Sequence, residues 1–200
     1  MANSIDTGNI RTKKALIRKK KLEVRHALSA EECSKMSSII CERLLASDEY
    51  KNAGSILLYK AYNNEVDTDM IFERAVADGK TVAYPVCRMA EGEPDLSFYV
   101  VNDNSQLTEG YMGIMEPDAS LQLELFDNRA DLCITPGVAF DGKCHRIGYG
   151  KAFYDRYIRL NEPACLIGFA YEIQMADDFE TEECDMAVDM VITDKTVYKR

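Results

Sequence analysis

Apolar residues recur at helical spacing in several segments of the chain. In residues 11–28, Ile17, Val24 and Leu28 share one face of a helix whose surface is otherwise basic. The tetrapeptide SAEE at residues 29–32 has the Ser-x-x-Glu form of a capping box and predicts a second helix that ends near Ala46. Further helices are predicted at residues 67–79, 119–126 and 150–160. Residues 1–9 show no such spacing and are expected to form a flexible tail.

Short, mostly apolar runs predict the strands, at residues 55–61, 81–86, 95–101, 130–136, 164–170 and 187–193. The runs ADLCITP, ACLIGFA and AVDMVIT are apolar almost throughout, as in strands that are covered on both faces. Strands alternate with helices, and no linker, repeat or low-complexity segment interrupts them. The pattern therefore predicts a single α/β domain over residues 1–200, built as a three-layer sandwich around a mainly parallel sheet.

The composition excludes several classes of protein. With 46% hydrophobic and 29% charged residues, the chain is typical of a globular domain. The net charge of −10 argues against a general binder of nucleic acids or anionic membranes. Seven scattered cysteines without a CxxC pair, no signal-peptide core and no run of transmembrane length indicate a reduced, cytoplasmic protein. We therefore expect no nucleic acid and no membrane among its partners.

Charge is unevenly distributed along the chain. Residues 11–25 contain eight Lys or Arg and one acid, whereas residues 172–189 contain eight acids and no base. The basic helix leaves open a non-catalytic regulator that binds RNA or an acidic partner. The acidic total charge, and the lack of aromatic residues among the basic ones, argue against sequence-reading RNA binding.

The segment FDGKCHRIGYGKAFYDRYI, residues 140–158, lies between a predicted strand and a predicted helix. Its glycines fit neither common phosphate loop, because Ala152 stands where a Walker loop has Ser or Thr, and Phe153 where the dinucleotide fingerprint has its third glycine. Two glycines, Arg146, Lys151 and a helix N-terminus nevertheless favour anion binding. A tight strand-to-helix turn accounts for the glycines about equally well, so spacing alone does not decide between the two interpretations.

The same segment resembles the signature of the 5-formyltetrahydrofolate cyclo-ligase family, in which Phe-Asp is followed by Arg-Leu-Gly-x-Gly-x-Gly-Tyr-Tyr-Asp. KALIRKKKLEVRHALSAEE, NEVDT at residues 64–68 and MGIMEP at residues 112–117 resemble further family segments in the same order. The resemblance covers residues 13–193 and implies a fold similar to the sugar-phosphate isomerase and CoA-transferase folds. Cys144, Ala152 and Phe153 depart from the family's Gly, Gly and Tyr. A positive φ at Cys144 would be strained, and Ala152 narrows the loop by one methyl group.

This resemblance implies an enzyme that converts 5-formyltetrahydrofolate to 5,10-methenyltetrahydrofolate with ATP and Mg²⁺, by transfer of the γ-phosphoryl group to the formyl oxygen. The folate is expected with or without a polyglutamate chain, and the enzyme as a monomer. ATP contacts are expected from Lys14, Ala15, Leu16, Ile17, Arg18, Arg146, Ile147, Gly148, Tyr149, Gly150, Lys151, Ala152, Phe153 and Tyr154, of which Arg146 and Lys151 are catalytic. Folate contacts are expected from Lys60, Glu65, Tyr149, Gly150, Lys151, Ala152 and Phe153.

The resemblance implies Asp155 and Asp189 as the two Mg²⁺ ligands. Asp155 falls in the first turn of a predicted helix, and Asp189 interrupts the run AVDMVIT, where a carboxylate is costly unless it is paired or metal-bound. Plainer alternatives remain open: Asp155 favours a helix N-terminus, and Asp189 is an edge-strand or solvent-facing acid. His26 and His145 are assigned no role, because the reaction does not demand an acid–base group. Another ATP-using folate or amide enzyme also remains open, because the loop departs from the family pattern.

Overall fold

The computed structural model describes residues 7–200. The strands of its main sheet are β1 (Ser55–Leu57), β2 (Thr81–Ala90), β3 (Glu93–Val100), β6 (Leu132–Thr135), β9 (Leu166–Phe169), β10 (Met190–Ile192) and β11 (Val197–Lys199). Two short ribbons pair β4 (Leu107–Glu109) with β5 (Met115–Pro117), and β7 (Ala139–Phe140) with β8 (Arg146–Ile147). The helices are α1 (Thr7–His26), α2 (Ala30–Ala46), α3 (Asp48–Asn52), α4 (Asp69–Ala77) and α5 (Phe153–Asn161). Single 3₁₀ turns are η1 (Asn104–Gln106), η2 (Tyr111–Gly113), η3 (Ala119–Leu121) and η4 (Glu172–Gln174).

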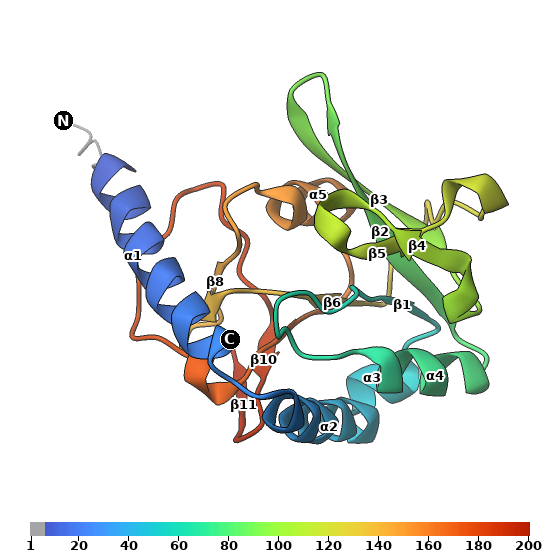
Figure 1. The fold of residues 1–200 in the computed structure, drawn as a ribbon, viewed down its shortest axis with the longest axis horizontal. Coiled ribbons are helices and arrows are strands. Elements are labelled where there is room, and N and C mark those ends of the chain that lie inside the picture. The colour runs from blue at the N-terminus through green and yellow to red at the C-terminus, as the bar shows by residue number, and fades with distance from the viewer. Residues whose placement is uncertain (1–6) are drawn as a thin grey trace.

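The main sheet has the order β11-β10-β9-β6-β1-β2-β3. Its five inner strands run parallel to one another, whereas the edge strands β3 and β11 are antiparallel to their neighbours. Figure 1 shows α2, α3 and α4 on one face of the sheet and α5 on the other, with α1 along one side. The three-layer α/β fold around a mainly parallel sheet is therefore confirmed.

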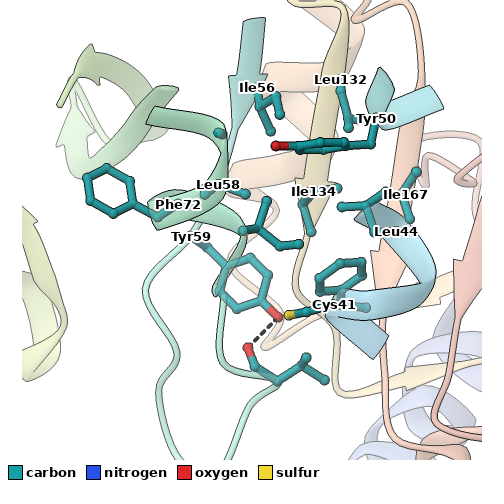
Figure 2. Packing of buried hydrophobic residues seen from close by; sticks show 14 of the residues in the cluster. Cys41, Leu44, Tyr50, Ile56, Leu58, Tyr59, Phe72, Leu132, Ile134 and Ile167 are labelled. Carbon is teal, nitrogen blue, oxygen red and sulfur yellow. Dashed lines mark hydrogen bonds between the residues drawn. The ribbon is translucent and has the colours of Figure 1, made fainter. Parts of the chain in front are cut away.

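A hydrophobic core fills the space on each face of the sheet. Figure 2 shows Leu44 of α2 and Tyr50 of α3 together with Ile134 of β6, in the core that α2, α3 and α4 cover. On the other face, the rings of Phe98 in β3 and Tyr157 in α5 have centroids 4.7 Å apart. Since both faces are covered, β6, β9 and β10 are buried and almost entirely apolar, as their sequences predicted.

The capping box predicted from SAEE is present at the start of α2. The Ser29 hydroxyl accepts a hydrogen bond from the Glu32 N–H, and the Glu32 carboxylate accepts one from the Ser29 N–H at 2.9 Å. The longest helix, α1, is strongly basic, and no helix within residues 7–200 is long and apolar enough to cross a membrane.

The structure differs from the sequence prediction at several element boundaries. Residues 1–6 of the predicted tail lie outside the described residues, and α1 begins at Thr7, so residues 7–9 are helical. The helix predicted at residues 119–126 is a single 3₁₀ turn, because Gln122 has a left-handed φ of 50° and Leu125 instead pairs with Tyr99 of β3. The short edge strand β11 was not predicted.

Candidate active site

A cavity of about 670 Å³ opens at the carboxyl ends of β1 and β6 and along the second half of β2. Parallel α/β sheets characteristically bind ligands at this edge, because the loops that follow the strands meet there. One face of α1, the loop between β8 and α5, and residues 182–185 complete the wall. Of the predicted site residues, the cavity is lined by Lys14, Arg18, Lys60, Glu65, Arg146, Ile147, Gly148, Tyr149, Gly150, Lys151, Ala152, Phe153, Tyr154 and Asp155.

The predicted residues of α1 divide between two faces of the helix. Lys14 and Arg18 are four positions apart, so both face the cavity, where the Arg18 Nε donates to the Gly148 carbonyl at 2.7 Å. Ala15, Leu16 and Ile17 lie between them in the sequence and do not line the cavity; the Leu16 side chain is 66% exposed. Of residues 14–18, all predicted to contact ATP, Lys14 and Arg18 are therefore the two whose side chains line the cavity.

The basic and acidic segments of the sequence face each other across the mouth of the cavity. Lys14 is buried and bonds the carboxylates of Glu182 and Asp185, and Arg11 also pairs with Glu182, at 3.0 Å. Nearby, Lys13 pairs with an acid of the same segment, Glu180, at 2.7 Å. These intramolecular pairs neutralise part of the basic face of α1, which weakens the alternative that this face binds RNA or an acidic partner.

The loop between β8 and α5 carries two left-handed residues. Gly150 has a φ of 92°, and Ala152, the N-cap of α5, has a φ of 55°. Cys144, just before β8, is also left-handed, with a φ of 63°. Cys144 therefore has the positive φ that would strain a residue with a Cβ, and Ala152 is strained in the same way.

Arg146 is buried beside this loop and retains an unused donor. Its Nη2 donates to the Asp155 carboxylate at 2.9 Å, and its guanidinium lies over the ring of Tyr154. Its Nε has no hydrogen-bond partner within residues 7–200, and neither has the Tyr154 hydroxyl. Lys151, by contrast, is exposed at the cavity wall. Because a buried unpaired donor is costly, Arg146 is placed to bind an acceptor that a ligand supplies.

The other end of the cavity contains a buried carboxylate. One oxygen of Glu65 accepts from the Tyr62 N–H at 3.1 Å, whereas its Oε1 has no hydrogen-bond partner within residues 7–200. Burial raises the pKa of Glu65 to about 7, although the charge of Arg25 opposes the rise. The neighbouring strand end is fixed by Tyr59, whose hydroxyl donates to a backbone carbonyl (Figure 2). Glu65 can therefore accept a hydrogen bond from a ligand.

Lys60 lines the same part of the cavity, but its ammonium group already has a protein partner. Its ammonium group bonds the Asp69 carboxylate at the start of α4 and lies 5.5 Å from the centre of the Tyr84 ring. The side chain of Lys60 therefore supports the wall, and contact with a ligand would come from other atoms of this residue.

The structure does not bring Asp155 and Asp189 together. Asp155 lines the cavity, whereas Asp189 immediately precedes β10, accepts from the Leu166 N–H at 2.8 Å and lies near Arg200. Asp189 thus lies just before a strand, at the amino edge of the sheet, and does not interrupt the strand. Asp185 lines the cavity in its place, and the adjacent Met186 N–H donates to Asp155 at 3.1 Å.

The cavity also contains residues that sequence reasoning missed. They are Arg11, Tyr59, Tyr62, Pro85, Cys87, Tyr111, Met112, Ile114, Glu116, Pro136, Gly137, Glu182, Cys184 and Asp185. Arg25, which was also missed, is buried next to the cavity but does not line it. The sequence could have predicted it, because Lys14, Arg18, Lys21 and Arg25 follow the 4-3-4 spacing of one helix face.

The fold and the cavity together define an α/β protein with a cavity lined by Lys14, Arg18 and Arg146 at the carboxyl edge of its sheet. The model of the 5-formyltetrahydrofolate cyclo-ligase family matches residues 10–194. The chain belongs to this family and is an enzyme of the ligase class, which confirms the resemblance found in its sequence.

Individual relatives match over nearly their full length. The 5-formyltetrahydrofolate cyclo-ligase of Escherichia coli (strain K12) is 28% identical, over 88% of this chain and 97% of its own. That of Haemophilus influenzae is also 28% identical, over 87% and 94%. The structure of Aquifex aeolicus 5,10-methenyltetrahydrofolate synthetase, 32% identical, covers 93% of this chain and 92% of its own with a TM-score of 0.79. The Mycoplasma pneumoniae synthetase, 26% identical, covers 90% and 98% with a TM-score of 0.67.

Proposed function

We propose that this chain catalyses the ATP-dependent cyclisation of 5-formyltetrahydrofolate to 5,10-methenyltetrahydrofolate, with release of ADP and phosphate. Family membership over residues 10–194 supports the reaction class. The observation that carries the proposal is that a single cavity holds cations for phosphates at one end and, at the other, the buried Glu65 carboxylate, one oxygen of which accepts no hydrogen bond within residues 7–200. The two reactants would therefore meet within one enclosed space.

The chemistry requires activation of the formyl oxygen, which is a poor leaving group. Transfer of the γ-phosphoryl group of ATP to this oxygen gives an imidate phosphate and ADP. N10 of the folate then attacks the formyl carbon and loses its proton, and the C–O bond breaks to release phosphate. Such a reaction asks the protein mainly for positioning and charge stabilisation.

The residues of the cavity suit these two tasks. Lys14, Arg18 and Arg146 supply positive charge for the triphosphate, and Arg146 offers its unused Nε as a directed donor. The N–H groups at the start of α5 add partial positive charge. At the other end, Glu65 would accept from the donor edge of the pterin, because its Oε1 has no hydrogen-bond partner within the described residues.

Asp155 and Asp185 fit a Mg²⁺ site, because carboxylates that face a phosphate pocket are the ligands this ion prefers. Glu182, Cys184 and Asp185 present ligand atoms within 4.8 Å of one another, so acidic oxygen ligands are concentrated here. When bound, Mg²⁺ neutralises charge that develops on the phosphates during transfer. Lys14, which now pairs with Asp185, would become available to a phosphate group.

One assay tests the proposal directly. The purified protein, incubated with 5-formyltetrahydrofolate, ATP and Mg²⁺, should generate the near-ultraviolet absorbance of the methenyl product. Substituting an ATP analogue that cannot transfer its γ-phosphoryl group should abolish the signal. Product formed equally well with the analogue would contradict the phosphorylated intermediate.

A matched pair of variants tests the nucleotide end of the cavity. Lys14→Ala should weaken ATP use strongly, because the buried Lys14 lines the cavity, whereas Lys20→Ala should leave it nearly unchanged, because Lys20 is exposed elsewhere on α1. Equal defects in both variants would mean that α1 contributes only a diffuse positive field.

A further inference from the structure

Arg25, in the last turn of α1, is a fully buried cation that does not line the cavity. Its Nε donates to the Asn63 carbonyl at 3.0 Å and its Nη1 to the Gly137 carbonyl at 3.2 Å. Its Nη2 donates to the Tyr149 hydroxyl. A buried guanidinium is costly unless its donors are used, and here three of its nitrogens donate to partners in three separate segments.

Each of these partners belongs to a segment that forms the cavity wall. Asn63 lies in the loop after β1, Gly137 in the loop after β6, and Tyr149 in the loop between β8 and α5. Arg25 thus joins α1 to three loops at the carboxyl edge of the sheet. Because a planar fork fixes direction as well as distance, one side chain sets the relative positions of these loops.

Arg25 also faces Glu65, with 3.8 Å between its Nη1 and the unpaired Oε1. The ionisable groups that face Glu65 come from four segments: Arg25 from α1, Tyr59 after β1, Tyr149 from the loop between β8 and α5, and Tyr154 from α5. Burial raises the pKa of each of these tyrosines, so they remain neutral at physiological pH. Arg25 is the cation among these groups, and its charge favours the carboxylate form of Glu65.

We infer that Arg25 is a positioning residue for the folate end of the site: it keeps Glu65 an ionised acceptor and holds Tyr149 in place, without touching either substrate. The identity of the ligand rests on the proposed function. An ionised Glu65 selects a ligand edge that carries N–H donors, whereas a protonated Glu65 would present a donor of its own and lose that selectivity.

The test measures binding of 5-formyltetrahydrofolate without ATP between pH 6 and 9, in the wild type and in Arg25→Gln. Wild-type affinity should rise with pH through the ionisation of Glu65 near pH 7 and then level off. Without the charge of Arg25, this midpoint should move up by at least about one pH unit, so that binding at pH 7 weakens at least about fivefold and recovers toward pH 9. In Glu65→Gln the profile should lack this transition, with or without Arg25.

Lys21→Gln is the matched control. Lys21 also ties α1 to the body of the protein, by donating to the carbonyls of Ile173 and Met175, but it does not contact Glu65. Its loss should leave the midpoint unchanged. An unchanged midpoint in Arg25→Gln, or an equal shift in Lys21→Gln, would overturn the inference.

If Arg25→Gln does not fold, Arg25→Lys tests whether Arg25 positions the folate end of the site. A single ammonium group cannot replace the fork toward Gly137, Asn63 and Tyr149, so folate should bind at least about fivefold more weakly at pH 8 while the KM for ATP stays near the wild-type value. Wild-type folate affinity together with a wild-type pH midpoint in Arg25→Lys would overturn the inference.

A carboxyl ¹³C titration of Glu65 in the ligand-free protein separates this inference from the proposed function. Failure of the wild type to bind 5-formyltetrahydrofolate would contradict the proposed function alone. The titration would still test Arg25, because the ¹³C midpoint of Glu65 should rise in Arg25→Gln whether or not folate is the ligand. A midpoint equal to that of the wild type would refute the role assigned to Arg25.

Discussion

Ala152 holds a backbone conformation that glycine adopts without strain. Its φ is 55°, its side chain is exposed, and it starts α5 without a side-chain cap. Replacing it by glycine removes the left-handed penalty of a Cβ at the cost of a more flexible unfolded chain. We expect Ala152→Gly to raise the free energy of unfolding by about 0.5–1 kcal/mol, measured by urea denaturation.

Two comparisons make this prediction specific. Ala77, exposed in the last turn of α4, is right-handed, so Ala77→Gly should lower stability instead. Cys144 is equally left-handed but fully buried, so Cys144→Gly loses packing as it relieves strain and should gain less than Ala152→Gly. A loss of stability in Ala152→Gly would show that its backbone is not strained.

Glu65 should make the stability of the fold depend on pH. Burial raises its pKa from 4.5 to about 7 in the folded protein, so the folded state binds the proton more tightly than the unfolded state. Its contribution to stability is therefore fully present below about pH 4.5 and is lost as the pH rises to about 7, by roughly 3 kcal/mol. Urea denaturation from pH 4.5 to 8 should reveal this fall in the wild type and its absence in Glu65→Gln.

An exposed acid provides the control for the pH experiment. Glu23→Gln changes the same functional group on the solvent side of α1 and should keep the wild-type pH dependence. A Glu65→Gln profile parallel to that of the wild type would mean that Glu65 titrates normally in the folded protein.

Among single residues, those fixed by a local motif could be predicted, and those placed by tertiary contacts could not. Lys14, Arg18 and Arg146, which the motif match singled out for contacts with ATP, line the cavity. Asp185 was missed because it lies in a loop with no periodic pattern. The family resemblance implied Asp189 as a metal ligand, and the cost of an acid within an apolar run supported that expectation. The structure resolves that cost without a metal, since Asp189 accepts the Leu166 N–H at the edge of the sheet.

At the scale of elements, local signals predicted α2 well and failed where tertiary pairing prevailed. The capping box fixed the start of α2, because its two hydrogen bonds form within four residues. Residues 119–126 looked helical, yet the strand end of β3 recruits Leu125 into a bridge with Tyr99. No local pattern reports such a partner, since it lies more than 20 residues away in the chain.

The docking of α1 has two parts that respond differently to mutation. Its first half is joined to residues 180–185 largely through ion pairs of Arg11, Lys13 and Lys14, whereas its second half is held by hydrogen bonds to backbone carbonyls. Glu182→Gln removes the charge that Arg11 and Lys14 share. Since a surface pair such as Arg11–Glu182 contributes up to about 1 kcal/mol, amide hydrogen exchange at residues 9–16 should accelerate roughly two- to fivefold.

The neighbouring Glu183 is exposed and supplies the control for this experiment. Glu183→Gln should leave exchange throughout α1 at the wild-type rate, and Glu182→Gln should spare residues 18–26. Uniform acceleration along the whole helix in Glu182→Gln would show that α1 docks as one unit.

For the whole molecule, the order of strands explains why distant segments form one site. The loops after β1 and β6 meet because these strands are parallel neighbours, although more than 70 residues separate them in the chain. The alternation of strands and helices predicted such an edge, but not which of its loops would carry the functional groups. The same geometry separates Asp155 and Asp185, at the carboxyl edge, from Asp189 at the amino edge.

This separation predicts different effects for three conservative substitutions. Asp155→Asn and Asp185→Asn should each raise the Mg²⁺ concentration needed for half-maximal rate and lower kcat, because each removes a charge from the end of the cavity where we propose that the ATP phosphates bind. Asp189→Asn should leave the Mg²⁺ dependence unchanged and lower the free energy of unfolding by about 1 kcal/mol, because the Leu166 N–H loses a charged acceptor.

The combined variants test whether Asp155 and Asp185 serve one ion. Residues that hold the same ion fail as a unit, so the double variant of Asp155 and Asp185 should lose much less activity than the product of the two single losses. Adding Asp189→Asn to Asp155→Asn should instead give independent effects, since Asp189→Asn acts on stability alone. For both pairs of residues, the activities of the single and double variants are measured as steady-state rates over a Mg²⁺ titration. A Mg²⁺ requirement raised by Asp189→Asn and untouched by Asp185→Asn would reverse the assignment, because it would place the ion at the amino edge of the sheet.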